Sequence, residues 1–309
     1  MAKKEFCVII LLLVVISLGI VPVLAQDNQP EASVWDGESR FTVLVLGIDR
    51  RPSEGATISV RTDVVMLVSI DPETEKAGIL VIPRDTHMAP PGADDFVRVN
   101  SLLVVGERLQ DGYGPYYVMD TVQYNLGLYI DRYIIFDFEA FIAIVDALGG
   151  IEITIEYAIY DSSYPDMNYG YDPFSLRAGT HLLNGYDALR FARTRHADSD
   201  FMRSSRQLQV VKAIFNRVSQ RGLLPSLIMR APQLFETIEN DIYTDLTLDE
   251  MIQFASYGLL LDEEEISTGS LNEEYNMTYT LPNGRSVYIP DRSRMLEMMT
   301  NIFGANYSQ

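Results

Sequence analysis

Cysteine and histidine are nearly absent from this chain of 309 residues. The single cysteine, Cys7, lies in the first apolar stretch, which excludes disulfides, cysteine metal sites and a thiol nucleophile from the rest of the chain. The histidines are His87, His181 and His196, and no two of them have the i, i+4 spacing of zinc ligands on a helix. We therefore expect neither a zinc hydrolase nor a Ser-His-Asp hydrolase.

Basic residues are also scarce. The chain has 24 Lys and Arg against 43 Asp and Glu, a net charge of −19, which argues against broad binding to nucleic acid or to an anionic membrane. Of the basic residues, 20 are arginine and only 4 are lysine. Arginine makes forked contacts with phosphate and carboxylate groups, so an anionic ligand would have to be held locally by arginines.

The first 25 residues have the character of a targeting segment. Two lysines precede an uncharged apolar run from Phe6 to Ala25. The run ends in Val-Leu-Ala, which resembles a signal peptidase site, but its 20 residues are also long enough to remain as a membrane anchor. We expect the body of the protein to work at the extracytoplasmic face of the cell membrane, either anchored or secreted.

The rest of the chain reads as a linker followed by one domain. Residues 26–40 are polar and contain proline and glycine, which is typical of a linker. From residue 41 to residue 309 no second linker and no repeat interrupts the alternation of helical and strand patterns. With 47% hydrophobic and 22% charged residues, this part should fold as one α/β or α+β domain.

Three apolar segments in the first half predict buried strands. They are Phe41–Ile48, Val64–Ile70 and Gly78–Ile82, all rich in Val, Ile and Leu. The Asp71-Pro72 turn leaves no room for a crossover helix, so the second and third strands should be antiparallel neighbours.

The second half alternates helical and strand patterns. We expect Asp137 to cap a helix that ends at Gly149-Gly150, and the tyrosine-rich stretch Tyr157–Phe174 to form a mobile loop. The expected helices are Pro115–Asn125, Phe138–Leu148, a short one near Asn184-Gly185, and Ser204–Gln220, and the expected strands are Tyr133–Phe136 and Ile151–Ile155.

Charged residues flank the three predicted strands where a meander would bring their ends together. They are Asp49, Arg50, Arg61, Asp63, Arg84 and Asp85. On an extended chain Arg61 and Asp63 would face the same side. These residues form either a set of weak surface salt bridges or a binding site for an anion.

A second group of basic residues surrounds the start of the long predicted helix. It consists of Arg190, Arg193, Arg195, Arg203 and Arg206, and Gln207 lies beside them. Cations near a helix N-terminus are disfavoured by the macrodipole, so something anionic should offset them. Asp200 as a capping acid and a bound phosphate are both consistent with this pattern.

A series of motifs resembles the LytR-CpsA-Psr family. Single tripeptides would be weak, but this many in the same order are highly specific. They are Leu46-Gly47-Ile48-Asp49, Arg61-Thr62-Asp63, Ile82-Pro83-Arg84-Asp85-Thr86, Arg98-Val99-Asn100, Phe136-Asp137-Phe138, Asp146-Ala147-Leu148-Gly149-Gly150, Leu183-Asn184-Gly185, Arg193-Thr194-Arg195, and Asp200 with Arg203 and Arg206-Gln207.

The resemblance implies a fold and an activity. It implies a single α/β/α sandwich with a mixed, partly antiparallel central sheet and an apolar groove for a polyprenyl chain. We expect that groove near Ala140–Ala147 or Tyr116–Leu126, although both segments could equally be core. It implies Mg²⁺-dependent transfer of a glycopolymer from a polyprenyl-pyrophosphate carrier to a cell-wall acceptor, typically a peptidoglycan hydroxyl.

The resemblance also implies residue roles. Asp49 and Asp63 would hold Mg²⁺ against the pyrophosphate, which suits a hard cation, and Asp63 or Asp85 would accept the proton of the attacking hydroxyl. The pyrophosphate oxygens would be bound by Arg61, Arg84, Arg193, Arg195 and Gln207, and Arg203 and Arg206 should join them. We expect Asp63, Arg61, Arg84 and Asp85 to act in catalysis.

Two other functions use the same residues. A hydrolase would let water replace the glycan acceptor at the polyprenyl pyrophosphate. A non-catalytic envelope protein would only bind the lipid-linked polymer, but it would need no pair of metal-holding acids such as Asp49 and Asp63.

Overall fold

The computed structural model describes residues 34–50, 55, 57–166, 170–194, 200–218, 237–238, 240–258, 261 and 263–308. Their largest element is a six-stranded sheet in the order β11-β6-β1-β2-β3-β12. Its strands are β1 (Phe41–Ile48), β2 (Thr62–Asp71), β3 (Lys76–Val81), β6 (Arg132–Phe136), β11 (Ile242–Thr244) and β12 (Ile266–Ser270). The predicted targeting segment lies outside the described residues, as does most of the predicted linker.

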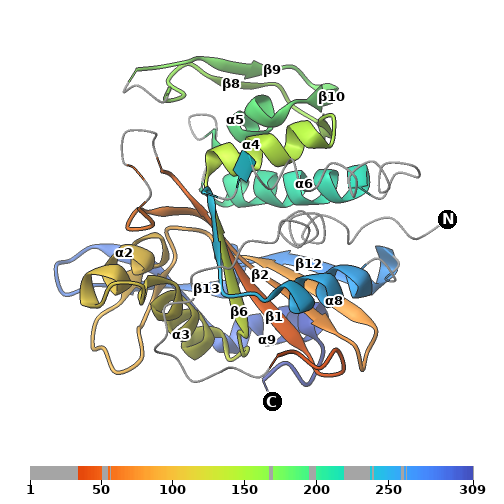
Figure 1. Ribbon diagram of the computed structural model, residues 1–309. Helices are drawn as coiled ribbons and strands as arrows, with labels where there is room; N and C mark the ends of the chain where they lie inside the picture. The colour runs from red at the N-terminus through yellow and green to blue at the C-terminus, as the bar shows by residue number, and fades with distance from the viewer. Residues whose placement is uncertain are drawn as a thin grey trace.

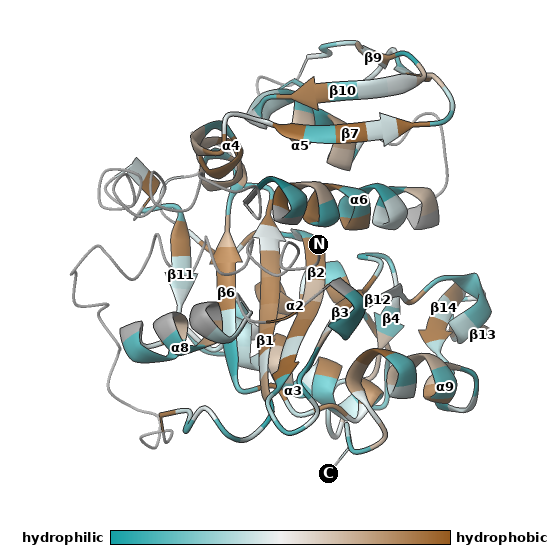
Figure 2. Ribbon diagram, turned by 90° about the vertical axis from the view of Figure 1, so that its right-hand side faces the viewer, coloured by the Kyte–Doolittle hydropathy of each residue, from teal (hydrophilic) through white to brown (hydrophobic). Residues whose placement is uncertain are grey.

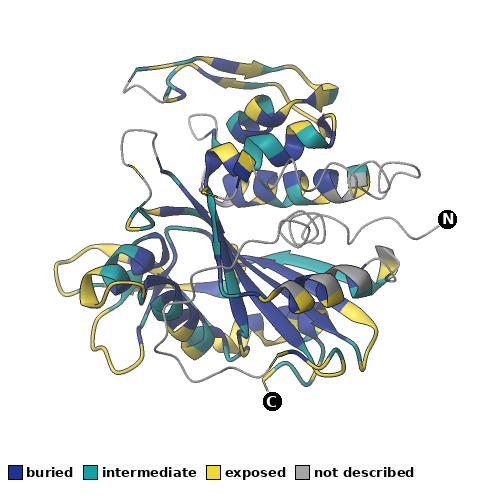
Figure 3. Cartoon of the chain, viewed as in Figure 1, coloured by how far each residue is buried: buried dark blue, intermediate teal, exposed yellow. Residues whose placement is uncertain are grey.

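The sheet is mixed, as the sequence predicted. Strands β1, β2 and β3 form an antiparallel meander, whereas β6 runs parallel to β1 and β12 runs parallel to β3. Strand β11 closes the other edge by pairing antiparallel with β6. The strands at the centre of the sheet are buried and predominantly hydrophobic, because helices cover both faces (Figures 2 and 3).

Helices on either side complete the α/β/α sandwich (Figure 1). One core lies between a sheet face and α2 (Val99–Leu109), α3 (Gly114–Leu126) and α9 (Arg292–Phe303). The other core joins the opposite face to α4 (Phe138–Ala147), α5 (Gly185–Arg193), α6 (Asp200–Val218) and α8 (Leu248–Gly258). None of the helices in the described part of the chain is long and apolar enough to cross a membrane.

Strand pairs outside the central sheet form a separate outer layer and two hairpins. They are β7 (Ile151–Ile155) with β10 (Gly179–Leu183), β8 (Ile159–Asp161) with β9 (Phe174–Leu176), β4 (His87–Met88) with β5 (Val97–Arg98), and β13 (Asn276–Thr280) with β14 (Ser286–Pro290). The remaining elements are the 3₁₀ turns η2 (Glu263–Glu265) and η3 (Glu273–Tyr275).

The tyrosine-rich stretch 157–174 corrects one prediction. Instead of a mobile loop, its described residues include β8 and the start of β9, which pair antiparallel. Tyr164 and Phe174 are buried and their ring centroids lie 6.3 Å apart. The aromatic residues therefore stabilise this hairpin by packing against each other and against the core formed with α4, α5, α6 and α8.

Helix ends are set by the residues that the sequence suggested. Asp137 accepts a hydrogen bond from the N–H of Ala140 at 3.1 Å, and Asn184 accepts one from Asp187 at 2.8 Å. Gly149 and Gly150 have φ angles of 72° and 89°, a conformation that glycine adopts without strain, and α4 ends just before them.

Two half-buried carboxyl groups flank β6. Asp131 accepts from the N–H of Thr42 at 2.7 Å and Asp245 accepts from the N–H of Tyr133 at 2.8 Å. Burial raises the pKa of each carboxyl to about 6 from a usual value of 3.8. Between these two values the folded chain holds protons that the unfolded chain has lost. The free energy of unfolding should therefore fall as the pH rises from 4 to 6.

Asp131→Asn and Asp245→Asn should each make the decrease in the free energy of unfolding between pH 4 and 6 smaller by on the order of 1 to 3 kcal/mol. The amide oxygen still accepts the hydrogen bond, but the side chain no longer titrates. Chemical unfolding at pH values from 4 to 8 measures this, with the exposed Asp94→Asn as the control. Identical pH profiles for wild type and both variants would assign the dependence to other groups.

Candidate active site

The ends of β1, β2 and β3 bring three aspartates together, as expected from the meander. Asp49 follows β1, Asp63 lies at the start of β2, and Asp85 lies four residues after β3. The register of β1 and β2 pairs Gly47 with Val64 and Ile48 with Thr62, so Asp63 is the extra residue of a bulge. Bulges re-aim side chains next to active sites.

Arg84 connects two of these carboxylates. Its Nη1 forms an ion pair with Asp63, and its Nε lies 3.5 Å from Asp85 Oδ2. Asp85 also lies 3.0 Å from Arg98 Nη1 and 3.9 Å from Arg203 Nη2. The charged groups at the ends of β2 and β3 therefore form one network.

Arg193, near the end of α5, joins the remaining aspartate to this network. Its Nη2 lies 3.1 Å from Asp49 Oδ2, and its Nε lies 3.7 Å from Asp63 Oδ2. One guanidinium thus contacts the two carboxylates that were predicted to hold the metal. The second predicted cluster meets the first here, although the two are more than 100 residues apart in sequence.

The start of α6 supplies three further predicted residues, all of them buried. Arg203 reaches Asp85, and Gln207 Nε2 donates to the backbone oxygen of Asp63 at 3.3 Å. Arg206 Nη2 donates to the carbonyl of Thr194 at 2.6 Å, which anchors the segment after α5.

Among the described basic residues named from the sequence, Arg50, Arg61 and Arg190 do not join this network. Arg190 pairs with Asp172 and Asp187 instead. Arg61 is exposed, and no described carboxylate forms an ion pair with it, because the bulge at Asp63 breaks the two-residue alternation. Arg50 turns toward Asp137 and Asp241 instead. Arg195 lies outside the described residues.

The aromatic surroundings of Arg193 were missed at the sequence level. Its guanidinium carbon lies 4.0 Å from the ring centroid of Phe138, and its Nη1 donates to the Tyr164 hydroxyl at 3.4 Å. Burial raises the pKa of Tyr164, so its phenol stays neutral at neutral pH. Phe138 stands in a quoted family motif, but nothing local in the sequence indicates Tyr164.

Phe138→Leu should lower kcat/KM by about three- to thirtyfold, because a ring face under a partly desolvated guanidinium contributes about 0.5 to 2 kcal/mol. The variant should stay folded with only a small loss of stability, since Leu retains most of the apolar contact. Tyr164→Phe keeps its ring and should lose less. Steady-state kinetics with varied donor concentration measure this. If Phe138→Leu had wild-type kinetics, the Phe138 ring would have no role in the site.

The carboxylates fit a single divalent cation better than a metal cluster. No group of three or more metal-ligating side chains occurs among the described residues. However, Asp49 and Asp63 already face one cationic group, the guanidinium of Arg193. Mg²⁺ commonly uses one or two carboxylates together with substrate phosphate oxygens and waters.

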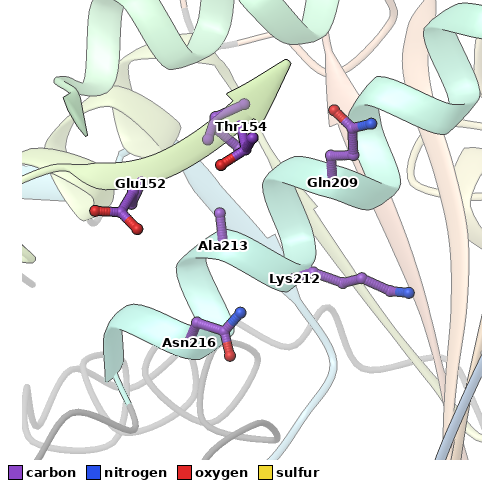
Figure 4. A pocket seen from close by; sticks show the side chains of 7 residues that line it. Glu152, Thr154, Gln209, Lys212, Ala213 and Asn216 are labelled. Atoms are coloured by element: carbon purple, nitrogen blue, oxygen red, sulfur yellow. The ribbon is translucent and has the colours of Figure 1, made fainter. Parts of the chain in front are cut away.

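The described residues do not reveal the expected lipid groove. A small polar pocket of about 150 Å³ lies between β7 and α6 and includes Glu152, Thr154 and Lys212 (Figure 4). A larger one of about 560 Å³ lies against α3 and the start of α9. The buried apolar residues of α3 and α4 belong to the two cores.

Comparison with known proteins identifies relatives over most of the chain. TagU of Bacillus licheniformis, a polyisoprenyl-teichoic acid–peptidoglycan teichoic acid transferase, is 29% identical over 269 residues, which are 86% of this chain and 78% of TagU. TagU of Bacillus subtilis (strain 168) is 29% identical over 276 residues, which are 89% of this chain and 80% of TagU.

Solved structures agree on the fold. The crystal structure of B. subtilis TagV superposes with a TM-score of 0.67 at 23% identity, covering 88% of this chain and 99% of TagV. The profile of the LytR_cpsA_psr family matches residues 22–303. The motifs, the fold and these matches together establish that the chain belongs to the LytR-CpsA-Psr family and is an enzyme of its phosphotransferase type.

Proposed function

We propose that the protein transfers a glycopolymer from a polyprenyl-pyrophosphate carrier to a hydroxyl of peptidoglycan, with Mg²⁺ as cofactor. The similar TagU proteins are named as enzymes that move teichoic acid from a polyisoprenyl carrier to peptidoglycan. The observation that supports this most directly is that Arg84 and Arg193 both form ion pairs with Asp63, although they come from different layers of the fold. With Arg98 and Arg203 beside them, four arginines surround three aspartates in a chain of net charge −19.

This arrangement suits a pyrophosphate diester. In the transfer, the acceptor oxygen bonds to the phosphorus that carries the glycan, and the bond from that phosphorus to the bridging oxygen breaks. Polyprenyl phosphate leaves, and the former bridging oxygen carries the negative charge that develops as the bond breaks. Arginines held in fixed positions stabilise the growing charge, so most of the rate gain comes from positioning and electrostatics.

The proton of the attacking hydroxyl passes to a carboxylate. Asp63 and Asp85 are both candidates, and the Asp85 side chain is 29% exposed, which leaves it accessible to an incoming acceptor. Asp49 and Asp63 would hold Mg²⁺, which would neutralise charge on the pyrophosphate oxygens.

The lipid part of the donor would need an apolar groove near the site. The helices α3 and α4 remain the places to look for its walls. We further propose that the protein acts at the extracytoplasmic face of the cell membrane, with residues 1–25 as an anchor or a cleaved signal.

The test incubates the full-length protein in detergent with a polyprenyl-pyrophosphate oligosaccharide, peptidoglycan fragments and Mg²⁺, and follows product masses. Transfer of the glycan phosphate to the fragments, abolished by EDTA and restored by Mg²⁺, supports the proposal. The Asp85 exposure also admits water, so free glycan phosphate as the only product would favour a hydrolase. Bound but intact lipid would favour a binding protein.

A further inference from the structure

Two hairpins outside the central sheet meet beside Asp85. In the β4–β5 pair His87 lies opposite Arg98, and Arg98 contacts Asp85 at 3.0 Å. The β13–β14 hairpin packs against β4, and Figure 2 displays these strands next to one another. This surface therefore begins at one of the two candidate proton acceptors, Asp85.

His87 links the second hairpin to the site. Its Nδ1 lies 3.0 Å from the backbone oxygen of Asp85, and its Nε2 lies 3.3 Å from Nη2 of Arg285, in the turn between β13 and β14. Because a guanidinium only donates, Nε2 accepts and Nδ1–H donates to Asp85. Burial lowers the pKa of His87, which agrees with a neutral ring.

An aromatic pair lies on the same surface. The ring centroids of Phe96 and Tyr279 are 4.9 Å apart, and Tyr279 is 40% exposed. Phe96 lies directly before β5, two residues from Arg98. Each of the two hairpins therefore contributes an aromatic ring and an arginine to this surface.

The surface also holds an arginine that no carboxylate of the described residues pairs with, Arg285. Arg98 shares Asp85 with Arg84 and Arg203. Across the described ranges, no carboxylate lies within ion-pair distance of the exposed Arg285, and its Nη2 contacts the imidazole of His87. An exposed guanidinium that no described carboxylate pairs with is available to an anionic group of a ligand.

We propose that this surface binds the acceptor: the ring faces of Phe96 and Tyr279 pack against the apolar face of an N-acetylated pyranose, and Arg285 pairs with a carboxylate of the same glycan. The proposal rests on the transferase function above and names the acceptor as an acidic glycan strand. The pyranose C–H face is apolar, so burying it on aromatic rings is favourable, and a guanidinium forks onto a carboxylate. Both contacts would place a sugar hydroxyl near Asp85.

The experiment measures binding and turnover separately in the full-length protein. The probe is a tetrasaccharide of alternating N-acetylglucosamine and N-acetylmuramic acid, whose lactyl groups supply carboxylates. Calorimetry without donor gives the affinity, and kinetics with varied acceptor give KM. Phe96→Ala, Tyr279→Ala and Arg285→Gln should each weaken binding and raise the acceptor KM about tenfold, with donor KM unchanged.

Matched variants serve as controls. Tyr288 is 42% exposed on the same hairpin, but it pairs with Thr278 and so lies on the opposite face from Tyr279. Tyr288→Ala should therefore behave as wild type, and Tyr279→Phe should retain most of the affinity. Circular dichroism confirms that each variant is folded.

The outcomes distinguish this inference from the proposed function. If wild type binds the tetrasaccharide and the three variants do not, the inferred binding surface is confirmed even if no glycan transfer is detected. If wild type transfers glycan and the variants bind and turn over normally, the inference is wrong while the function stands. Failure of wild type to bind the tetrasaccharide also overturns it.

Discussion

Arg84→Ala should lower kcat/KM for glycan transfer by about 10²- to 10³-fold, the loss found when one fixed donor to a developing oxyanion is removed. The side chain lies three residues after β3 and contacts both Asp63 and Asp85. Its removal therefore takes away one positive charge and releases two carboxylates at once. The loss should appear mainly in kcat, because the charge it stabilises grows in the transition state.

Two further variants make the Arg84 test specific. Arg84→Lys should recover only part of the activity, because an ammonium cannot make the forked contact. Arg108→Ala, on an exposed part of α2, should leave kinetics unchanged. An Arg84→Ala enzyme within threefold of wild type would show that the arginine is a structural ion-pair partner only.

Glu250→Ala should lower the free energy of unfolding by about 3 to 5 kcal/mol, because it leaves a buried arginine without its counter-ion. Glu250 is fully buried, and its two oxygens accept from Arg132 Nη2 at 2.7 Å and Nε at 3.2 Å. It also accepts from the N–H groups of Trp35 and Thr247. One carboxylate thus ties the segment before β1, strand β6 and the start of α8 together.

Urea unfolding at neutral pH measures this effect. Asp249→Asn is the matched control, because Asp249 is exposed in the same helical turn. Glu250→Gln should fall between the two, since it keeps the shape and loses the charge. A loss below about 1 kcal/mol for Glu250→Ala would mean that water solvates Arg132 in the variant.

The central strands were predictable because their signal is local. Strand β1 has the predicted bounds, and β2 and β3 differ by one or two residues at each end. A strand buried on both faces must be a continuous apolar run, which is readable without knowledge of its neighbours. The caps Asp137 and Asn184 were predictable for the same reason, since each bonds an N–H three residues away.

Other elements depended on partners far along the chain. Helix α2 was not predicted, and its start has no side-chain cap and no acidic first turn. Strand β12 pairs with β3 across about 190 residues, and the β8–β9 hairpin owes its order to the packing of Tyr164 and Phe174. Such pairings leave no period in the local sequence.

The sequence by itself determined the fold class, the meander and the types of residue at the site, because motif order and apolar runs are properties of the chain. Only the tertiary structure decided which charges meet. The bulge at Asp63 turns that carboxylate toward Arg84 and Arg193 and leaves Arg61 exposed, while Arg50 is drawn to Asp137. The attraction between two charges weakens as their separation in space grows. That separation is set by the fold and cannot be read from the number of residues between them.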